Sequence, residues 1–343
     1  MTTRPSLSRF HTAIQARMCI VIVSTAHPDY PFILLSNRDE FLNRPTAGAT
    51  WWDEPNSHVL GGRDLQRAER GTWLAITKQG RIAALTNFRE EDDDRKAKDK
   101  SRGGIVNAYL TSPPGKRESP QRFAERLIND FGVNDVGGFS LLFGELRAPK
   151  DQSFSGLSIL SNRSASAEDL TTIASSPLET HGLSNSHFGD TSWPKVVHGE
   201  QLLKQAVAAD VTRGGKNQDY FIKSLFDILS IDMLPKRMEG EDWNSYVQQM
   251  RNSILIPPVG GPSVDVAPAD QLASGQTTDA TTNGSGVQVG QTGYGTQKQT
   301  VILVDQKGRV KFVERTLYDQ HGSPMKEKDG ERMYEFDIEG WDS

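Results

Sequence analysis

Short apolar runs separated by turns dominate the start of the chain. Residues 19–23 and 32–36 are strand-length runs on either side of His27-Pro28-Asp29, and this spacing is typical of a β-hairpin. Two further runs, 72–77 and 81–86, flank a Lys-Gln-Gly turn. The pattern therefore predicts a β-meander in the first half of the protein.

Helical spacing appears further along. It begins at residues 105–110 and resumes after Ser119-Pro120, a pair that is placed as an N-cap and a first-turn proline. Two longer amphipathic helices are expected around 196–207 and 221–229, where apolar residues recur every three or four positions. Strands are expected at 139–143, 157–160, 300–304, 310–313 and 334–336.

Strand runs with helices grouped between them favour an α+β layered architecture over a parallel doubly wound sheet. Residues 257–300 are rich in Gly, Ser, Thr, Gln and Asp and poor in large apolar side chains. Such a segment cannot bury enough surface to offset the entropy of ordering it, so we expect a flexible insertion there. One domain over residues 19–340 is favoured, because the C-terminal strands are too few to fold alone.

Composition excludes several classes of protein. A chain of 343 residues with 36% hydrophobic content can bury a full core, and a net charge of -5 gives no reason to expect nucleic acid or an anionic membrane as partner. Its apolar runs are too short to span a bilayer. The single cysteine, Cys19, rules out an internal disulfide and a cysteine-rich zinc site and points to a reducing compartment. No metal and no cofactor is expected, and the oligomeric state stays open.

Residues 1–18 are rich in arginine and hydroxyl side chains and contain no acid. Leu7, Phe10 and Ile14 recur at helical spacing, and this composition fits a mitochondrial transit peptide cleaved close to Arg17. Alternatively, the true start is Met18 and the preceding residues are a leader without a targeting role. Both routes expose the same residue, Cys19.

A cysteine at the head of an apolar strand is often a small core residue. Exposure of its α-amine gives Cys19 a second role. An N-terminal amine has a pKa of roughly 7.7–8.0, so it can act as the base for the thiol of the same residue. Cys19 is therefore a candidate nucleophile as well as a candidate core residue.

Four polar residues, 37–40 (Asn-Arg-Asp-Glu), follow the second apolar run. One interpretation is a surface turn with salt bridges. In the other, alternation along an extended strand puts Arg38 and Glu40 on one face and Asn37 and Asp39 on the other, so that one of the two pairs faces a site beside Cys19 if the strands are hairpin neighbours. There Arg38 would lower the thiol pKa and Asp39 would hold the amine. Asn87 and Asn185 also close strand-like runs, either as turn residues or as part of the same site.

The motifs taken together resemble the NRDE (transport and Golgi organisation) family over residues 18–340. They are Met18-Cys19-Ile20, Ser36-Asn37-Arg38-Asp39-Glu40-Phe41, Arg44-Pro45, Gly71-Thr72-Trp73-Leu74, Ala84-Leu85-Thr86-Asn87, Gly182-Leu183-Ser184-Asn185, Trp193-Pro194-Lys195 and Tyr294-Gly295-Thr296. The resemblance implies a four-layer αββα sandwich of N-terminal-nucleophile (Ntn) hydrolase type. It also implies a role in Golgi organisation, protein secretion and trafficking, with cytoplasmic, Golgi and mitochondrial locations and with haem or acyl-lipid handling.

The layout also resembles that of bile-salt hydrolases and penicillin V acylases, in which an N-terminal cysteine attacks an amide. By that resemblance the catalytic candidates are Cys19, Arg38, Asp39, Asn87 and Asn185. The chain departs from those hydrolases because Arg38 and Asp39 are adjacent, and Gln297 stands where an arginine is expected in relatives.

Two functions therefore remain open. The first is an Ntn-type cysteine hydrolase or acyltransferase acting on a linear amide. The second is a non-catalytic trafficking factor that carries a small-molecule ligand such as haem or an acyl lipid. For haem, the candidate axial ligands include His27, His58, His181 and His187.

Overall fold

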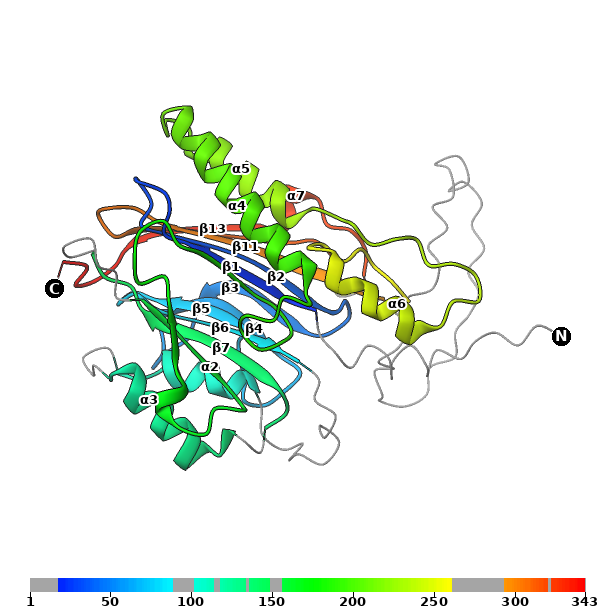
Figure 1. Ribbon diagram of the computed structural model, residues 1–343. Coiled ribbons are helices and arrows are strands. Elements are labelled where there is room, and N and C mark those ends of the chain that lie inside the picture. The colour runs from blue at the N-terminus through cyan, green and yellow to red at the C-terminus, as the bar shows by residue number, and fades with distance from the viewer. Residues whose placement is uncertain are drawn as a thin grey trace.

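Two antiparallel sheets lie face to face in the computed structural model, with helices on both outer sides (Figure 1). The structure describes residues 18–88, 102–113, 118–133, 136–148, 156–260, 293–319 and 322–342. The expected leader therefore lies outside the described residues, except for Met18.

The first sheet has the strand order β10 (Thr180–Leu183), β1 (Ile20–Ser24), β2 (Phe32–Phe41), β11 (Tyr294–Val304), β12 (Arg309–Thr316) and β13 (Glu331–Asp337). The second sheet is a meander in sequence order: β3 (Thr46–Trp51), β4 (Val59–Asp64), β5 (Leu74–Thr77), β6 (Arg81–Asn87), β7 (Phe139–Glu145), β8 (Leu157–Ser161) and β9 (Thr171–Ile173). The meander thus begins at β3, whereas the predicted one included the β1–β2 hairpin, which belongs to the other sheet.

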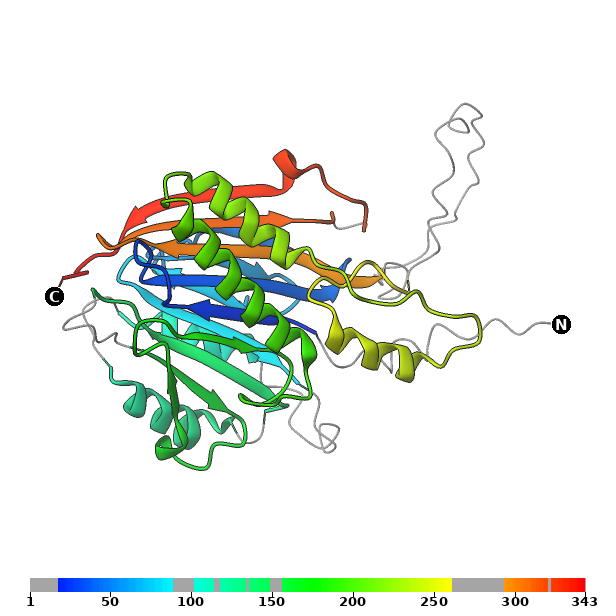
Figure 2. The same ribbon diagram turned by 45° about the horizontal axis from the view of Figure 1, so that its top comes forward.

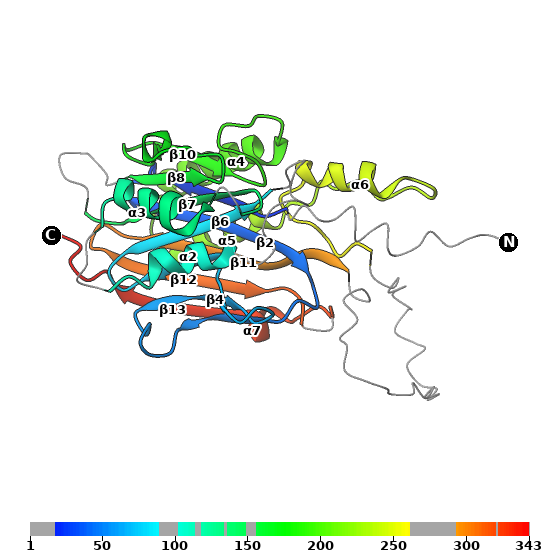
Figure 3. The ribbon, with the colours of Figure 1, turned by 90° about the horizontal axis from the view of Figure 1, so that it is seen from below.

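Helices α4 (Pro194–Thr212) and α5 (Gln218–Leu229) cross the outer face of the first sheet (Figure 2). On the far side, α2 (Arg102–Leu110) and α3 (Pro120–Arg126) cover the second sheet, as the view from below shows (Figure 3). The shorter helices are the π-helical turn Leu127–Phe131, α6 (Trp243–Gln249), α7 (Glu327–Gly330) and the 3-10 turns Ala167–Asp169 and Met250–Asn252. The expected fold class, a four-layer αββα sandwich, is confirmed.

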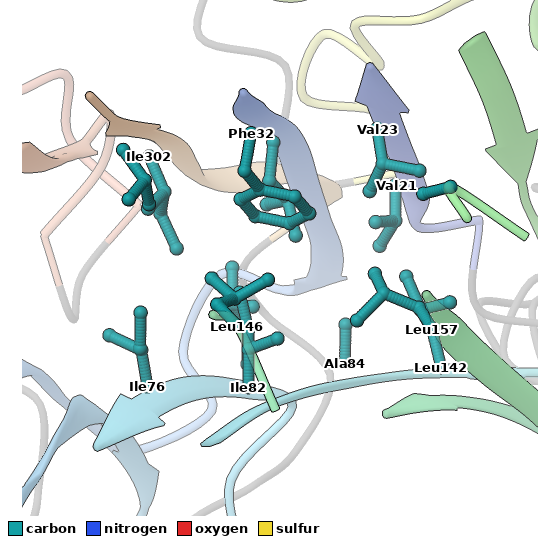
Figure 4. Close-up of a cluster of buried hydrophobic side chains, with 14 of the residues drawn as sticks. Val21, Val23, Phe32, Ile76, Ile82, Ala84, Leu142, Leu146, Leu157 and Ile302 are labelled. Atoms are coloured by element: carbon teal, nitrogen blue, oxygen red, sulfur yellow. The ribbon is translucent and has the colours of Figure 1, made fainter. Parts of the chain in front are cut away.

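The central layer of the core consists of alternate side chains from the two facing sheets. Val21 and Phe32 point from the first sheet toward Ile82 and Leu142 of the second (Figure 4). The intervening residues, such as Ile33, face the helical layer of α4 and α5. Strand alternation therefore places every odd residue of β1 between the sheets, because successive side chains point to opposite faces.

Several local predictions are confirmed. β1 and β2 pair antiparallel, with Val21 opposite Ser36, as the predicted hairpin requires. Ser119 caps α3 by accepting a hydrogen bond from Arg122 N at 3.2 Å, and Pro120 occupies the first turn.

Among the described residues, no helix combines the length and apolar character needed to cross a membrane.

The prediction of a flexible insertion over residues 257–300 is wrong for its C-terminal residues. Residues Tyr294 to Thr300 belong to β11, which pairs with β2 on one side and β12 on the other, and every residue of this strand is buried. At the other end, Val259 forms a β-bridge with Tyr294. Residues 261–292 lie outside the described residues. The first part of β11, before residue 300, was not predicted because its polar side chains find their partners in neighbouring strands, and composition does not show such pairing.

Candidate functional site

Cys19 lies immediately before β1 and is 7% exposed. Its Sγ lies 3.8 Å from the backbone oxygen of Asp39 on β2. Its own carbonyl oxygen accepts a hydrogen bond of 2.7 Å from Ser184, which follows β10. The cysteine is therefore held by the two strands that flank β1.

The polar tetrad 37–40 lies inside β2, and each of the four side chains is buried. The surface-turn interpretation is therefore wrong. Continuing the β1–β2 register places Arg38 opposite Cys19, on the face between the sheets. Arg38 stacks on Trp73 at 4.4 Å, bonds to Gln297, and lies 3.6 Å from Glu40. A positive charge thus lies on the same face of the sheet as Cys19.

Asp39 lies on the opposite face of β2, toward the helices. Its Oδ1 accepts a 2.6 Å hydrogen bond from Thr296 on β11. Its Oδ2 is buried, has no hydrogen-bond partner among the described residues, and lies 4.0 Å from Nζ of Lys195. Lys195 in turn donates a hydrogen bond to the carbonyl oxygen of Met18. The carboxylate is therefore close to the peptide bond that precedes Cys19.

The two predicted asparagines meet at the C-terminal end of β6, the central strand of the second sheet. Asn185 Nδ2 donates to the backbone oxygen of Asn87, and Asn185 Oδ1 lies 3.2 Å from the hydroxyl of Ser184. Since that hydroxyl also holds Cys19, a continuous chain of contacts joins Cys19 to Asn87. Oδ1 of Asn87 itself is buried without a partner in the described part of the chain. All five predicted residues are thus brought together.

Burial and the nearby Asp39 carboxylate raise the pKa of the Cys19 thiol to about 11, although Arg38 acts in the opposite direction. Arg38 lowers the thiol pKa, as expected, but burial and Asp39 outweigh this effect in the chain with Met18 attached. The amide nitrogen of Cys19 is then part of a peptide bond and is not a base. In this form the thiol stays protonated at neutral pH.

Burial also raises the pKa of Asp39, from 3.8 to about 6, against the opposing charge of Lys195. For Lys195, burial lowers the pKa. Burial thus disfavours the charged form of each member of the pair, and their mutual attraction offsets only part of that cost.

The raised pKa of Asp39 predicts a specific pH dependence of stability. The Asp39 carboxyl group binds its proton more tightly in the folded protein than in the unfolded chain. Its contribution to the free energy of unfolding is therefore complete below pH 3.8 and is lost as the pH rises through about 6. In urea unfolding, the free energy of wild type minus that of Asp39→Asn should fall by up to about 3 kcal/mol between pH 4 and pH 7. The exposed control Asp53→Asn should show no such trend, and a flat difference for Asp39→Asn would contradict the assignment.

The histidines proposed as haem ligands have other partners. His27 pairs with Asp210 at 3.2 Å, His58 lies 3.2 Å from the Leu110 oxygen, and His181 pairs with Glu179. Within the described ranges, no group of three His, Cys, Asp or Glu side chains is arranged to hold a metal ion.

His187 lines a cavity of about 210 Å³ between β10 and the start of α4. Phe188, Trp193 and Val196 supply apolar walls, and Ser184, which bonds to Cys19, is part of the lining. Pockets for drug-sized ligands usually measure about 300–1,000 Å³. This cavity is therefore suited to part of a ligand and is too small for a whole haem. Its link to Cys19 is Ser184, since none of the five predicted site residues lines it.

Sequence reasoning did not assign roles to three neighbours of Cys19: Lys195, Ser184 and Thr296. Each lies within a motif that carried the family resemblance, at Trp193-Pro194-Lys195, Gly182-Leu183-Ser184-Asn185 and Tyr294-Gly295-Thr296. The signal was therefore present as motifs, but no chemical reason attached to it until the contacts with Met18, Cys19 and Asp39 were known.

The fold and the site together define a class of αββα sandwich proteins with a cysteine at the head of the first strand. Residues 18–319 match the family model described as Transport and Golgi organisation 2, and the chain belongs to that family. The resemblance inferred from the NRDE motifs is confirmed by this match.

Relatives with curated names cover nearly the full length of the chain. The human Transport and Golgi organization protein 2 homolog is 29% identical over 315 residues, which is 90% of this chain and 94% of the human protein. The Bos taurus homolog is 30% identical over 294 residues, or 84% of this chain and 87% of the relative. The Drosophila melanogaster protein is 29% identical and covers 89% of this chain and 95% of its own length.

Solved structures that align with this chain include two hydrolases. The Caenorhabditis elegans N-acylethanolamine-hydrolyzing acid amidase ortholog has a TM-score of 0.33 at 12% identity and covers 68% of this chain and 98% of its own. A variant of conjugated bile acid hydrolase from Clostridium perfringens has a TM-score of 0.35 at 9% identity, covering 95% of this chain and 98% of its own.

Proposed function

We propose that the protein, once the residues before Cys19 are removed, cleaves a linear amide with Cys19 as nucleophile, as a hydrolase or an acyltransferase. This chemistry serves a role in protein secretion and in transport and Golgi organisation, and the relatives are named after the last two. The proposal extends to a cytoplasmic location with Golgi and mitochondrial association.

Two buried oxygens that have no hydrogen-bond partner in the described part of the chain carry the proposal: Oδ2 of Asp39, whose ion-pair partner Lys195 lies 4.0 Å away, and Oδ1 of Asn87. An unpaired buried polar atom costs about 1–3 kcal/mol, so such atoms call for an explanation, and a missing ligand is one. Asp39 faces the peptide bond before Cys19, where a freed α-amine would donate to it. Asn87 comes from the other sheet, where its amide is available to a substrate.

The reaction would proceed in two steps, the acylation of Cys19 and the release of the acyl group. The α-amine of Cys19 takes the thiol proton, and the thiolate adds to the amide carbonyl, whose oxygen becomes an oxyanion that accepts a hydrogen bond from Nδ2 of Asn87. Collapse expels the amine product, which leaves with the proton from the α-ammonium group. Water or an acceptor alcohol or amine then gives a proton to the free α-amine and attacks the Cys19 thioester. The C–S bond breaks, the acyl product leaves, and the proton passes from the α-ammonium group to the Cys19 thiolate.

The uncleaved form favours a second candidate function. With Met18 in place, Cys19 has no amine and its thiol pKa is about 11, so this form has no reactive nucleophile at neutral pH. A chain that keeps its leader would act as a carrier of a small ligand, of which an acyl lipid or haem is the proposed class. The small cavity beside Ser184 would then hold only one end of the ligand.

Intact-mass analysis and covalent labelling separate the two functions. Protein purified from the cells that make it should begin at Cys19, and an alkyl haloacetamide at pH 7 should add once, because the chain has one cysteine. The matched controls are Cys19→Ser and the chain that retains residues 1–18, and neither should react. Native protein that keeps its leader, or a free Cys19 that resists labelling, would overturn the hydrolase and favour the carrier.

A further inference from the structure

We propose that Lys195 is a positioning residue for Cys19: its ammonium lies beside the α-amine created by removal of Met18, and its positive charge promotes proton loss from the amine–thiol pair. This inference rests on the proposed function, because it concerns the form of the protein that begins at Cys19.

Lys195 occupies an unusual place for a lysine. It is the second residue of α4, and its side chain is fully buried. Lysine is almost never fully buried unless it is paired. Its Nζ donates to the Met18 oxygen and lies 4.0 Å from Oδ2 of Asp39. The first of these contacts is with the peptide bond that must be broken to free Cys19, and the second is with the carboxylate that is proposed to hold the freed amine.

Covalent geometry converts these contacts into a distance from the future amine. The Met18 oxygen and the Cys19 nitrogen are bonded to the same carbon, which places them about 2.3 Å apart. Because Nζ is within hydrogen-bond reach of that oxygen, it lies within about 5 Å of the Cys19 nitrogen. Removal of Met18 also takes away one hydrogen-bond acceptor of Lys195 and leaves the amine in its place.

A cation at this distance favours the deprotonated form of a neighbouring acid. The amine and the thiol of Cys19 exchange a proton, so they titrate as a pair with macroscopic pKa values. Lys195 lowers the first macroscopic pKa of the pair, whether the amine or the thiol loses the proton. At about 5 Å and an effective dielectric of about 20, the expected shift is roughly 1–2 pH units after allowance for the opposing Asp39 charge.

Other ionisable groups face Cys19 from β2 and β11. Arg38, Asp39 and Glu40 act on it from β2. Tyr294 on β11 is buried, which raises its pKa well above 10, so it stays neutral near pH 7. These groups remain in place when Lys195 is replaced. A change in the titration of Cys19 therefore reports the Lys195 charge, whereas a purely structural partner of Asp39 would leave the titration unmoved.

The test uses the chain that begins at Cys19, labelled with ¹³C-cysteine. Because Cys19 is the only cysteine, its Cα and Cβ give one pair of resonances whose pH titration reports the amine and the thiol. We expect Lys195→Met to raise the first midpoint by roughly 1–2 pH units. Lys195→Arg should keep the wild-type midpoint, and Lys204→Met, on the exposed side of the same helix, should leave it unchanged.

A second comparison covers the case in which Lys195→Met does not fold, since that variant leaves Asp39 buried without its cation. The variants Asp39→Asn and Asp39→Asn/Lys195→Met differ only in the lysine and contain no unpaired carboxylate. The midpoint should again be higher in the variant without Lys195. An unchanged midpoint in the variants that fold would overturn the role of Lys195 even if wild type reacts with the haloacetamide. Loss of that reaction in wild type would instead count against the proposed function.

Discussion

Replacing Asn87 by alanine is expected to lower kcat for amide cleavage by about 100- to 1,000-fold while KM changes little. Removal of one oxyanion donor typically costs this much, about 2.7–4 kcal/mol, because the donor acts on charge that develops only in the transition state. In this protein the backbone oxygen of Asn87 accepts a hydrogen bond from Asn185, which fixes the residue, and the side-chain Oδ1 has no hydrogen-bond partner in the described part of the chain. The donor to the oxyanion would be Nδ2 of the same amide.

Steady-state kinetics on the chain that begins at Cys19 would check this expectation. Asn107→Ala is the matched control, because Asn107 also has a buried unpaired Oδ1 but lies on α2, away from Cys19. It should retain wild-type kcat. A kcat within threefold of wild type in Asn87→Ala, or a rise in KM alone, would exclude Asn87 as the oxyanion donor.

Lys298→Met is expected to cost about 3–5 kcal/mol of stability, since it leaves a buried carboxylate without its cation. Lys298 on β11 lies 3.4 Å from Oε1 of Glu314 on β12, and the two side chains are only 3% and 2% exposed. The same oxygen accepts a 2.8 Å hydrogen bond from Ala49 N on β3, so the carboxylate also ties the two sheets together.

Urea unfolding at pH 7 would measure this loss. The double variant Lys298→Met/Glu314→Gln removes both charges and keeps an acceptor for Ala49, so it should recover at least half of the lost free energy. If the single variant loses less than about 1 kcal/mol, or the double variant is no more stable than the single one, the pair is not a buried charge pair of the kind described.

The apolar strands were predictable because their signal is local. A run such as 32–36, bounded by turn residues, needs no knowledge of its neighbours to be identified as a strand. The same holds for the N-terminus of α3, where Ser119 and Pro120 act within one helical turn. Elements that have a local sequence signal were therefore predicted at the right place, although their observed ends differ from the predicted ones.

Polar strands could not be predicted in this way. Residues 37–40 and 296–300 are polar, and composition alone favours a turn or a flexible segment. Both segments are buried because each supplies the partners of the other: Asp39 accepts from Thr296, and Arg38 bonds to Gln297. Such pairing depends on contacts more than 250 residues apart in the chain, which a single sequence does not reveal.

Lys195 was missed for a related reason. One lysine near the start of an amphipathic helix normally points to solvent, and nothing in the helical spacing of α4 separates it from Lys204. Only the packing of α4 against β1 and β10 shows that the first of these lysines reaches the peptide bond before Cys19. The sequence therefore located the cysteine and its strand neighbours but not the charge on the helix.

The central position of β11 has a consequence for synthesis on the ribosome. β2 leaves the ribosome early, but its partner β11 is made more than 250 residues later. At about 5–20 residues per second, this delay lasts roughly 15–50 s. During that time one edge of β2, with its buried polar tetrad, has no strand to pair with. Nascent chains would therefore depend on a chaperone to shield this edge, and the cysteine site would form only after β11 has been synthesised.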